Sequence, residues 1–334
     1  MKIALDAMGG DKAPAIEVEG AVEAVKEFGI EVILVGDKER IQAELDNYKT
    51  KDLPISIHHA SEVIGMDELP TEAYKQKKDS SLLSAIKLVK EGKADAIVSA
   101  GNTGAVMACA LFELGRIKGV SRPGLGIFFP AVKGRTLLLD VGANADCKPK
   151  NLLQFAIMGS VYYKYMVGIE NPRVALLSIG EEDTKGNELV IEAAKLIKKT
   201  NLNFVSNVEG RDIVGEKADV IVCDGFVGNV VLKFGESVAS NFFKILKKEL
   251  EGTSIFISFG ALLIKPVLRG LVKKTDYAEQ GCAPLLGING QCFISHGGSN
   301  VKAVKNALKN AAESITHKIS AHIEEEIAKA GDAE

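Results

Sequence analysis

Short apolar runs that predict β-strands alternate with segments of helical periodicity along almost all of the 334 residues. Strands are predicted at 2–6, 31–35, 54–58, 94–99, 125–129, 136–141, 173–179, 218–223 and 291–295. Helices are predicted in the segment that begins at Pro14, at 81–91, 151–166, 186–199 and 229–250, and from Ser299 towards Lys329. This alternation is typical of a mostly parallel sheet covered on both faces. The sequence therefore predicts a three-layer α/β/α fold.

No internal repeat, low-complexity tract or Pro/Ser-rich linker divides the chain. We therefore expect 1–334 to form a single α/β unit, with two interleaved lobes as the alternative. The net charge of −3 and the 46% hydrophobic content exclude a disordered chain and argue against a nucleic-acid partner. Five cysteines without a C-x-x-C pair disfavour disulfides and structural zinc. No run resembles a signal peptide or a spanning helix, so the expected location is cytoplasmic.

Glycine is frequent, at 33 residues, and it gathers directly after predicted strands. The clusters are DAMGGD (6–11), SAGNTGA (99–105), DVGAN (140–144), LLSIGEE (176–182), CDGFVGN (223–229) and ISHGGSN (294–300). Open α/β sheets bind ligands beyond the carboxyl ends of their strands, and glycine there lets backbone N–H groups approach a ligand. A helix that follows such a turn favours an anion at its N-terminus. Six such turns with polar neighbours predict one shared crevice for an anion.

Several motifs of other α/β enzymes are missing from the sequence. There is no G-x-G-x-x-G after the first strand, no G-x-x-x-x-G-K-[ST], no G-x-S-x-G and no H-E-x-x-H. Their absence weakens the dehydrogenase, NTPase, α/β-hydrolase and metalloprotease interpretations. A phosphate held by backbone N–H groups without a P-loop fits what remains.

Together with GCAPLLG (281–287), the glycine clusters resemble the acyl-ACP:phosphate acyltransferase family of bacterial phospholipid synthesis, from Met1 to about Lys329. LLSIGEEDTKGNE (176–188), VCDGFVGNVVLK (222–233) and YKQKKD (74–79) are similar, more distantly, to stretches of phosphotransacetylases. The resemblance implies a fold related to phosphotransacetylases and isopropylmalate dehydrogenases. It also implies that acyl-ACP and inorganic phosphate give acyl phosphate and holo-ACP. The product then feeds a membrane glycerol-phosphate acyltransferase.

The reaction that this resemblance implies agrees with the missing motifs. Phosphate near pH 7 is largely a dianion and already a nucleophile, and a thiol with a pKa near 8.5 is a good leaving group. Direct attack therefore needs no metal, no organic cofactor and no Ser or Cys nucleophile. It needs phosphate held in line with the carbonyl and donors for the developing oxyanion. An acyl-Cys intermediate is the alternative.

Four side chains that follow predicted strands are expected to act in the reaction. Asp224 would orient a donor or accept a proton, Asn229 would bond the thioester carbonyl, and Lys185 would neutralise phosphate charge. His296 would donate to the thioester oxygen or protonate the leaving sulfur, because imidazole titrates near neutral pH. The predicted substrate-binding residues are Gly9, Gly10, Asn102, Thr103, Gly104, Asp140, Asn144, Ser178, Glu181, Gly225, Gly228 and Gly297.

Each of these residues also has a structural interpretation. Asn102 would cap a predicted helix, and the turn at 224–229 would only join a strand to a helix. Asp140 and Asn144 would be ordinary turn residues, Lys185 would lie in a solvated loop, and His296 would bond turn backbone.

The segment 244–274 departs from the neutral average, with seven basic residues against two glutamates. Its apolar side chains recur at helical spacing beside a basic stripe, which is typical of a helix that binds a membrane surface or a partner. The predicted contact residues are Leu263, Lys265, Val267, Leu268, Arg269 and Lys273. We expect this segment to serve homodimerisation together with contact to acidic ACP or the membrane surface. Packing within the core or in a dimer interface is the alternative.

Three other functions stay open at this stage. A phosphotransacetylase-like enzyme would use CoA thioesters in a similar site, and a nicotinamide-dependent dehydrogenase would share the layered fold. A non-catalytic membrane scaffold for lipid enzymes would use the basic segment, but it would not need six polar glycine turns.

Overall fold

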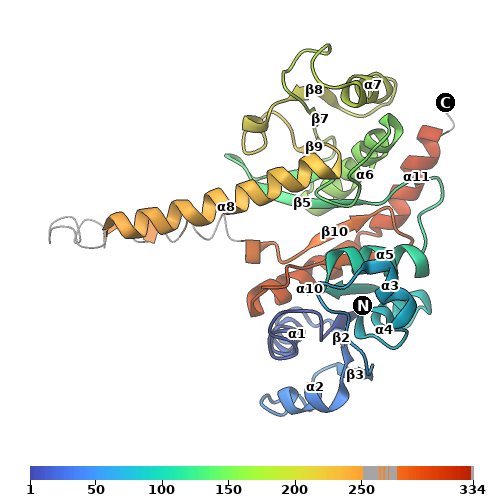
Figure 1. The fold of residues 1–334 in the computed structure, drawn as a ribbon, viewed down its shortest axis with the longest axis vertical. Coiled ribbons are helices and arrows are strands. Elements are labelled where there is room, and N and C mark those ends of the chain that lie inside the picture. Colours follow the sequence, from blue (N-terminus) through green and yellow to red (C-terminus); the bar gives the residue numbers. More distant parts are fainter. Residues whose placement is uncertain (251–262, 265, 268–269, 271–276, 332–334) are drawn as a thin grey trace.

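A computed structural model describes residues 1–250, 263–264, 266–267, 270 and 277–331 of the chain. In these residues one sheet has the strand order β3-β2-β1-β4-β11-β10-β5-β6-β9-β7-β8 (Figure 1). The strands are β1 (Lys2–Asp6), β2 (Glu31–Gly36), β3 (Ile55–His59), β4 (Ala96–Ser99), β5 (Gly124–Pro130), β6 (Arg135–Leu139), β7 (Val174–Leu177), β8 (Phe204–Val208), β9 (Val220–Val222), β10 (Ala283–Leu286) and β11 (Gln291–Ile294).

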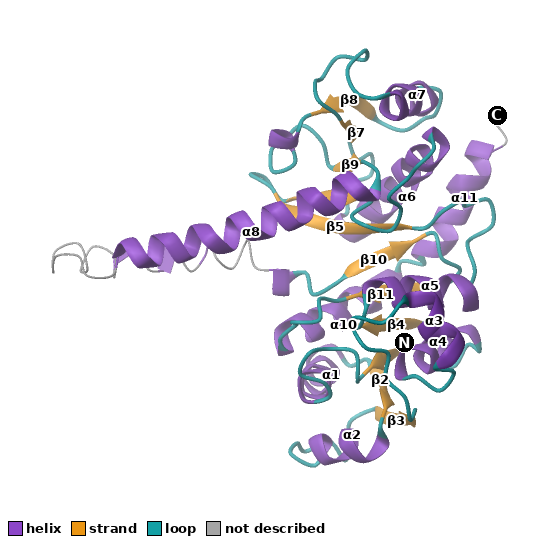
Figure 2. Ribbon diagram, in the orientation of Figure 1, coloured by secondary structure: helices purple, strands orange, loops and turns teal. Residues whose placement is uncertain are grey.

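Helices lie on both sides of this sheet (Figure 2), which confirms the predicted α/β fold. They are α1 (Ala15–Phe28), α2 (Lys38–Leu45), α3 (Pro70–Gln76), α4 (Ser81–Lys90), α5 (Thr103–Glu113), α6 (Pro149–Val167), α7 (Glu188–Ile197), α8 (Gly225–Leu250), α10 (Val301–Thr316) and α11 (Ile319–Gly331), with short 3₁₀ turns at Gly210–Asp212 and Tyr277–Glu279.

The sheet consists of two parallel halves that run in opposite directions. β3, β2, β1, β4 and β11 are parallel to one another, and so are β6, β9, β7 and β8. Between them, β10 is antiparallel to β11 and β5, and β5 is antiparallel to β6. The carboxyl ends of the strands in one half therefore point in the opposite direction to those in the other half. We group the glycine turns by the half of the sheet that they follow, and one shared crevice for all six stays a prediction.

Alternation along the strands assigns the helices to faces of the sheet. In β1, Ile3 and Leu5 pack with α1 and α10, whereas Ala4 packs with α4 and α5 on the other face. In β9, Val220 and Val222 pack with α6, α7 and α11, whereas Ile221 shares a cluster with the first turns of α8. Both faces of both halves are thus covered, as the apolar character of the strands requires.

The C-terminal region differs from the single helix expected from Ser299 towards Lys329. Lys318 adopts a left-handed φ of 50°, and the chain there divides into α10 and α11. The break has a packing reason, since α10 packs against α1 in the first half and α11 against α6 in the second. Strands β8 and β10 and helices α2 and α3 were not expected either.

Helix α8 begins at Gly225, four residues before the predicted start, and projects away from the sheet (Figure 1). Of the predicted contact residues beyond it, Leu263 and Val267 are about two-thirds exposed. Lys265, Leu268, Arg269 and Lys273 lie outside the described residues. None of the helices in the described residues combines the length and apolar character that a bilayer crossing needs.

Candidate functional site

The turns after β1, β4 and β11 meet at the carboxyl edge of the first half. A Cβ on Gly9 would lie 2.7 Å from the backbone nitrogen of Gly101, so the β1 and β4 turns touch through bare backbone. The N–H of Asp11 donates to the carbonyl of Gly297 over 2.9 Å, which joins the β1 and β11 turns. We call these three turns the first turn group. It brings together the predicted residues Gly9, Gly10, Asn102, Thr103, Gly104, His296 and Gly297.

Asp6 fixes the strand ends beneath the first turn group. Its side chain is buried and accepts the hydroxyl of Ser99 at 2.7 Å and the N–H of Met8 at 3.2 Å. The Ser99 hydroxyl in turn accepts the N–H of Gly101 at 3.1 Å. Burial raises the pKa of Asp6 above its ordinary value, and these donors oppose the rise. Asp6 therefore positions both the β1 and the β4 turn.

Asn102 caps α5 and holds a neighbouring loop. Its Oδ1 accepts the N–H of Ala105 at 3.1 Å, and its Nδ2 donates to the carbonyls of Met66 at 2.8 Å and Glu68 at 3.1 Å. The cap prediction is confirmed, because the polar atoms of this side chain bind backbone. The N–H groups of Thr103 and of the residue after it lie in the first turn, where the helix offers no carbonyl and its dipole favours an anion.

The basic stretch 74–79 adjoins the same loop. Lys77 contacts the Glu68 carboxylate and donates to the carbonyl of Val63 over 2.6 Å. Lys78 lies 4.0 Å from the ring centroid of Tyr74. The side chains of Lys77 and Lys78 thus bind groups of the protein itself.

His296 lies exposed on the β11–α10 turn. Its Nδ1 accepts the N–H of Gly298 at 2.9 Å, so in the neutral imidazole the proton resides on Nε2. The side chain therefore does bond turn backbone, and it also presents a donor on its other nitrogen. This neutral tautomer suits hydrogen bonding to an oxygen.

Glu17 is a site residue that the sequence analysis missed. It lies in α1 directly beneath the first turn group, is 1% exposed, and its Oε2 has no hydrogen-bond partner. A Cβ on Gly10 would lie 2.1 Å from Glu17 Oε1. Burial raises the pKa of Glu17 to about 7, and the charges of Asp6 and Asp11 add to the rise. The sequence does contain a signal that could have revealed Glu17, because this acidic residue lies in the same helix as the small buried residues Gly20, Ala21 and Ala24.

The turns after β6 and β9 form a second turn group, which contains Asp140, Asn144, Asp224, Gly225, Gly228 and Asn229. Asp140 is fully buried and accepts the N–H groups of Leu125, Gly142, Ala143 and Asn144, at 2.8 to 3.2 Å, and the Asn144 amide at 2.8 Å. Burial raises its pKa, and the donors oppose the rise. Asp140 is therefore a positioning residue that organises the DVGAN turn from inside.

The first turn of α8 fits tightly against this DVGAN turn. A Cβ on Gly228 would lie 1.8 Å from the carbonyl oxygen of Asp140, and the Gly225 N–H donates to the Asn144 carbonyl over 2.7 Å. Asp224 Oδ1 accepts the N–H of Val227 at 2.9 Å as a helix cap. These two glycines therefore serve close packing of backbone on backbone.

Asn229 lies on the inner side of the same turn of α8. Its Oδ1 would be 3.7 Å from a Cβ on Gly142. The side chain thus faces the DVGAN turn, where a bound carbonyl would need a donor.

Ser178, Glu181 and Lys185 lie in the loop after β7. The Ser178 hydroxyl donates to the carbonyl of Lys185 over 3.1 Å and so closes this loop. Glu181 pairs with Lys217 at 2.5 Å, and the Lys185 side chain is exposed. The loop borders the second turn group, because β7 is next to β9 in the sheet.

The cysteines are poorly suited to form an acyl-enzyme. Burial raises the pKa of Cys147 to about 11 and that of Cys109, Cys282 and Cys292 to about 12. Burial also raises the pKa of Cys223. A thiol that stays protonated near neutral pH is a weak nucleophile, which disfavours the acyl-Cys alternative. Among the described residues, no three His, Cys, Asp or Glu side chains converge to hold a metal ion.

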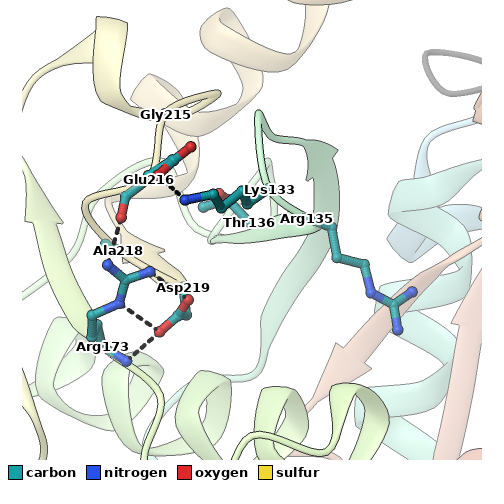
Figure 3. A pocket seen from close by; sticks show the side chains of 8 residues that line it. All are labelled: Lys133, Arg135, Thr136, Arg173, Gly215, Glu216, Ala218 and Asp219. Carbon is teal, nitrogen blue, oxygen red and sulfur yellow. Dashed lines mark hydrogen bonds and ion pairs between the residues drawn. The ribbon is translucent and has the colours of Figure 1, made fainter. Parts of the chain in front are cut away.

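Two cavities in the described part of the structure lie away from these turns. One of about 240 Å³ opens at the amino-terminal ends of β6, β7 and β9 (Figure 3). Of its three cations, Arg173 pairs with Asp219 at 2.9 Å, Lys133 pairs with Glu216 at 3.1 Å, and Arg135 donates to the carbonyl of Met166 over 3.0 Å. Another, of about 510 Å³, lies between Leu111 and Val120 at the end of α5. No predicted site residue lines either cavity.

Comparison with known proteins identifies the family. A family model described as "Fatty acid synthesis protein" matches residues 1–322. "Phosphate acyltransferase" of Geobacter sulfurreducens is 51% identical over 98% of this chain and 94% of its own length. "Phosphate acyltransferase" of Heliobacterium modesticaldum is 53% identical over 98% of both chains.

A solved phosphotransacetylase from Streptococcus pyogenes shares the fold, with a TM-score of 0.65, 18% identity and coverage of 95% of this chain and 94% of that one. The predicted relation to the phosphotransacetylase fold is therefore confirmed. With identity above one half to a relative over nearly its full length, the chain belongs to the phosphate acyltransferase family and is an acyltransferase.

Proposed function

We propose that this enzyme transfers a long-chain acyl group from acyl-ACP to inorganic phosphate, and that phosphate attacks the thioester directly. The observation that carries the proposal is the first turn group. There three strand ends meet through bare backbone beside the N-terminus of α5. Such a place offers N–H donors to an anion, and it needs no P-loop lysine or metal.

The chemistry balances with phosphate as the nucleophile. A phosphate oxygen forms a bond to the carbonyl carbon, the carbon–sulfur bond breaks, and the sulfur takes up a proton as the thiol of holo-ACP. In the proposed mechanism His296 donates a hydrogen bond from Nε2 to the developing oxyanion, and the departing thiolate takes its proton from solvent. Backbone N–H groups hold the phosphate in line, which supplies the largest part of the rate enhancement.

The second candidate is the same transfer with a CoA thioester as donor, which the phosphotransacetylase fold favours. Purified enzyme is incubated with phosphate and either long-chain acyl-ACP or acetyl-CoA, and acyl phosphate is trapped with hydroxylamine. A parallel reaction without phosphate measures direct aminolysis of the thioester. We expect phosphate-dependent hydroxamate from acyl-ACP. Product from acetyl-CoA alone would establish the second candidate, and no product from either donor would contradict both.

We also propose that α8 mediates homodimerisation. Phe226, Val230, Phe234, Val238, Phe242 and Ile245 recur every three to four residues along one face of this helix, and each is at least half exposed. A contiguous apolar stripe of this length marks an interaction surface. Because α8 projects from the sheet (Figure 1), a second copy of the chain can lie along it.

We propose that the exposed apolar side chains of Leu263, Ile264 and Val267, beyond the end of α8, contact ACP or the membrane surface. Contact with the membrane would bring acyl phosphate to a membrane glycerol-phosphate acyltransferase from a cytoplasmic enzyme. Replacing Leu263 and Val267 by Glu should abolish binding to liposomes while the far-UV circular dichroism stays unchanged. Unaltered liposome binding by the folded variant would refute the membrane contact.

A further inference from the structure

A buried carboxyl group lies under the first turn group and takes no part in the reaction described above. Glu17 reaches up from α1 to Gly10, and its Oε2 has no hydrogen-bond partner. Its own backbone N–H and that of Gly10 oppose the rise of its pKa. A carboxylate that is almost fully buried with one orphaned oxygen carries a large desolvation cost. Its charged state is therefore the one that the surroundings support least.

The β11–α10 turn, which the Asp11 N–H joins to the β1 turn, contains further polar atoms without partners. The hydroxyls of Ser295 and Ser299, on either side of the Gly297 turn, are buried and make no hydrogen bond. The Gly297 carbonyl oxygen lies 3.5 Å from the place of a Cβ on Gly10. Helix α1 packs against α10 through Gly20, whose Cβ would touch Val304. Unsatisfied polar groups thus gather beneath the first turn group.

The charges around Glu17 leave its carboxylate uncompensated. Asp6 on β1 and Asp11 in the turn both repel it. On the elements packed nearby, Arg40 of α2 donates to the Ala13 carbonyl, Lys305 of α10 pairs with Glu23 and Glu27 further along α1, and His296 binds the Gly298 N–H. No ion pair with Glu17 is found among the described residues.

We propose that Glu17 is a positioning residue of the anion site, and that phosphate binds at the first turn group together with uptake of a proton by the Glu17 carboxyl group. The ionised carboxylate holds the Gly10 N–H and opposes an anion above it. The neutral carboxyl group is a weaker acceptor and carries no charge, so the turn is free to bind phosphate. This inference rests on the proposed use of the first turn group for phosphate.

Linkage fixes the sign of the effect. Because an anion favours neutral Glu17, bound phosphate raises the pKa of this group, and affinity falls as pH rises through its value of about 7 in the free enzyme. Each pKa unit of coupling corresponds to about tenfold in affinity.

The test is titration calorimetry of the whole enzyme with inorganic phosphate, in pairs of buffers that differ in ionisation enthalpy, at pH values on either side of 7. Glu17→Gln keeps the shape and cannot ionise, and Glu27→Gln is a matched change at an exposed position of the same helix. We expect the wild type and Glu27→Gln to take up a proton with phosphate. Glu17→Gln should lose that uptake and bind about tenfold more tightly than the wild type above pH 7.

A change in the protonation of phosphate itself is common to all three proteins and cancels in the comparison. Equal uptake by the three proteins would overturn the inference. Should Glu17→Gln fail to fold, ¹³C NMR of glutamate-labelled wild type decides, because one carboxyl resonance must titrate near pH 7 and shift upwards in pKa with phosphate. No such resonance would overturn it.

The failures can be told apart. Acyl phosphate formation without Glu17-linked proton uptake refutes this inference alone. Proton-linked phosphate binding without any acyl phosphate refutes the proposed function alone.

Discussion

At the scale of single residues, the turns depend on positions where a side chain would collide and on acids that no solvent reaches. Gly9 and Gly228 allow backbone to pack on backbone. A Cβ on Gly9 would lie 2.7 Å from the backbone nitrogen of Gly101, and a Cβ on Gly228 would lie 1.8 Å from the carbonyl oxygen of Asp140. The Asp140 carboxylate accepts five hydrogen bonds and so organises its turn, whereas Glu17 has one carboxylate oxygen that accepts none. A satisfied buried acid fixes structure, and an unsatisfied one is sensitive to protonation.

Glu17 makes the stability of the enzyme fall as pH rises from about 4.5 to about 7. Its folded-state pKa is raised, so the folded protein holds the proton more tightly than the unfolded chain, and ionisation favours unfolding. At 1.36 kcal/mol per pKa unit, the rise from 4.5 to about 7 corresponds to about 3 kcal/mol. Urea unfolding at pH 5 and pH 8 should show this loss for the wild type relative to Glu17→Gln. An identical pH dependence of both proteins would disprove the assignment.

His296 should matter for turnover more than for binding. Loss of one hydrogen-bond donor to a developing oxyanion costs about 10²- to 10³-fold in rate, so His296→Ala should lower kcat by that factor and leave KM for phosphate nearly unchanged. The measurement is release of free ACP thiol. His58→Ala, at an exposed position of β3, is the control and should retain wild-type kcat. A kcat for His296→Ala within threefold of the control would remove His296 from the mechanism.

At the scale of elements, α8 combines two surfaces along its 26 residues. Its first turn is fixed by close contact with the DVGAN turn, and Val231 and Leu232 pack on the sheet. Further along, its apolar side chains are exposed. The helix that Asp224 caps and that carries Asn229 therefore also extends to the surface proposed for the second copy, so that association and the turn are mechanically connected.

Docking of α8 should fail when its first turn gains a side chain. Gly228→Ala places a Cβ 1.8 Å from the Asp140 carbonyl oxygen, and overpacking of this kind costs about 1–3 kcal/mol. Gly235→Ala in the same helix meets only the Phe129 ring edge at 3.2 Å, and the gain in helix propensity of about 1 kcal/mol offsets the contact. Chemical unfolding compares the two variants. Equal stability would mean that the first turn is not tightly docked.

The exposed stripe of α8 should control self-association. Replacing Phe234 and Phe242 together by Glu puts two charges into the stripe and should yield monomers in sedimentation velocity. Ser240→Glu, about 120° around the helix from Phe234, adds a charge on another face and should leave the association unchanged. A wild-type protein that sediments as a monomer, or a double variant that still associates, would contradict the proposal.

At the scale of the whole molecule, local patterns predict the elements and their turns, but not the directions of the strands. Apolar runs predicted β1, β2, β3, β4, β5, β6, β7, β9 and β11 closely, and the glycine clusters do follow strand ends. β10 has only the four residues APLL, between Cys282 and Gly287, and so has no local period to reveal it. Its antiparallel pairing with β11 and β5 leaves β5 parallel to β11, and the antiparallel pairing of β5 with β6 then reverses the second half. The place of β10 between β11 and β5 is set by pairing between segments far apart in the chain.

The candidate site shows the same limit. Turn residues were found because glycine and polar residues cluster in sequence, and Asn102 and Asp224 cap helices as local rules suggest. Glu17 was missed because its burial depends on α1 packing against α10, some 280 residues later. The groups in contact with one another are therefore known only from the fold.

The central claim is direct transfer of an acyl group from a thioester to phosphate, and ³¹P NMR of the enzyme with phosphate and long-chain acyl-ACP tests it most directly. The account predicts a new acyl phosphate resonance that grows in equal amount with free ACP thiol, and no loss of acyl-ACP when phosphate is omitted. Release of thiol without an acyl phosphate resonance would show hydrolysis and would contradict the account.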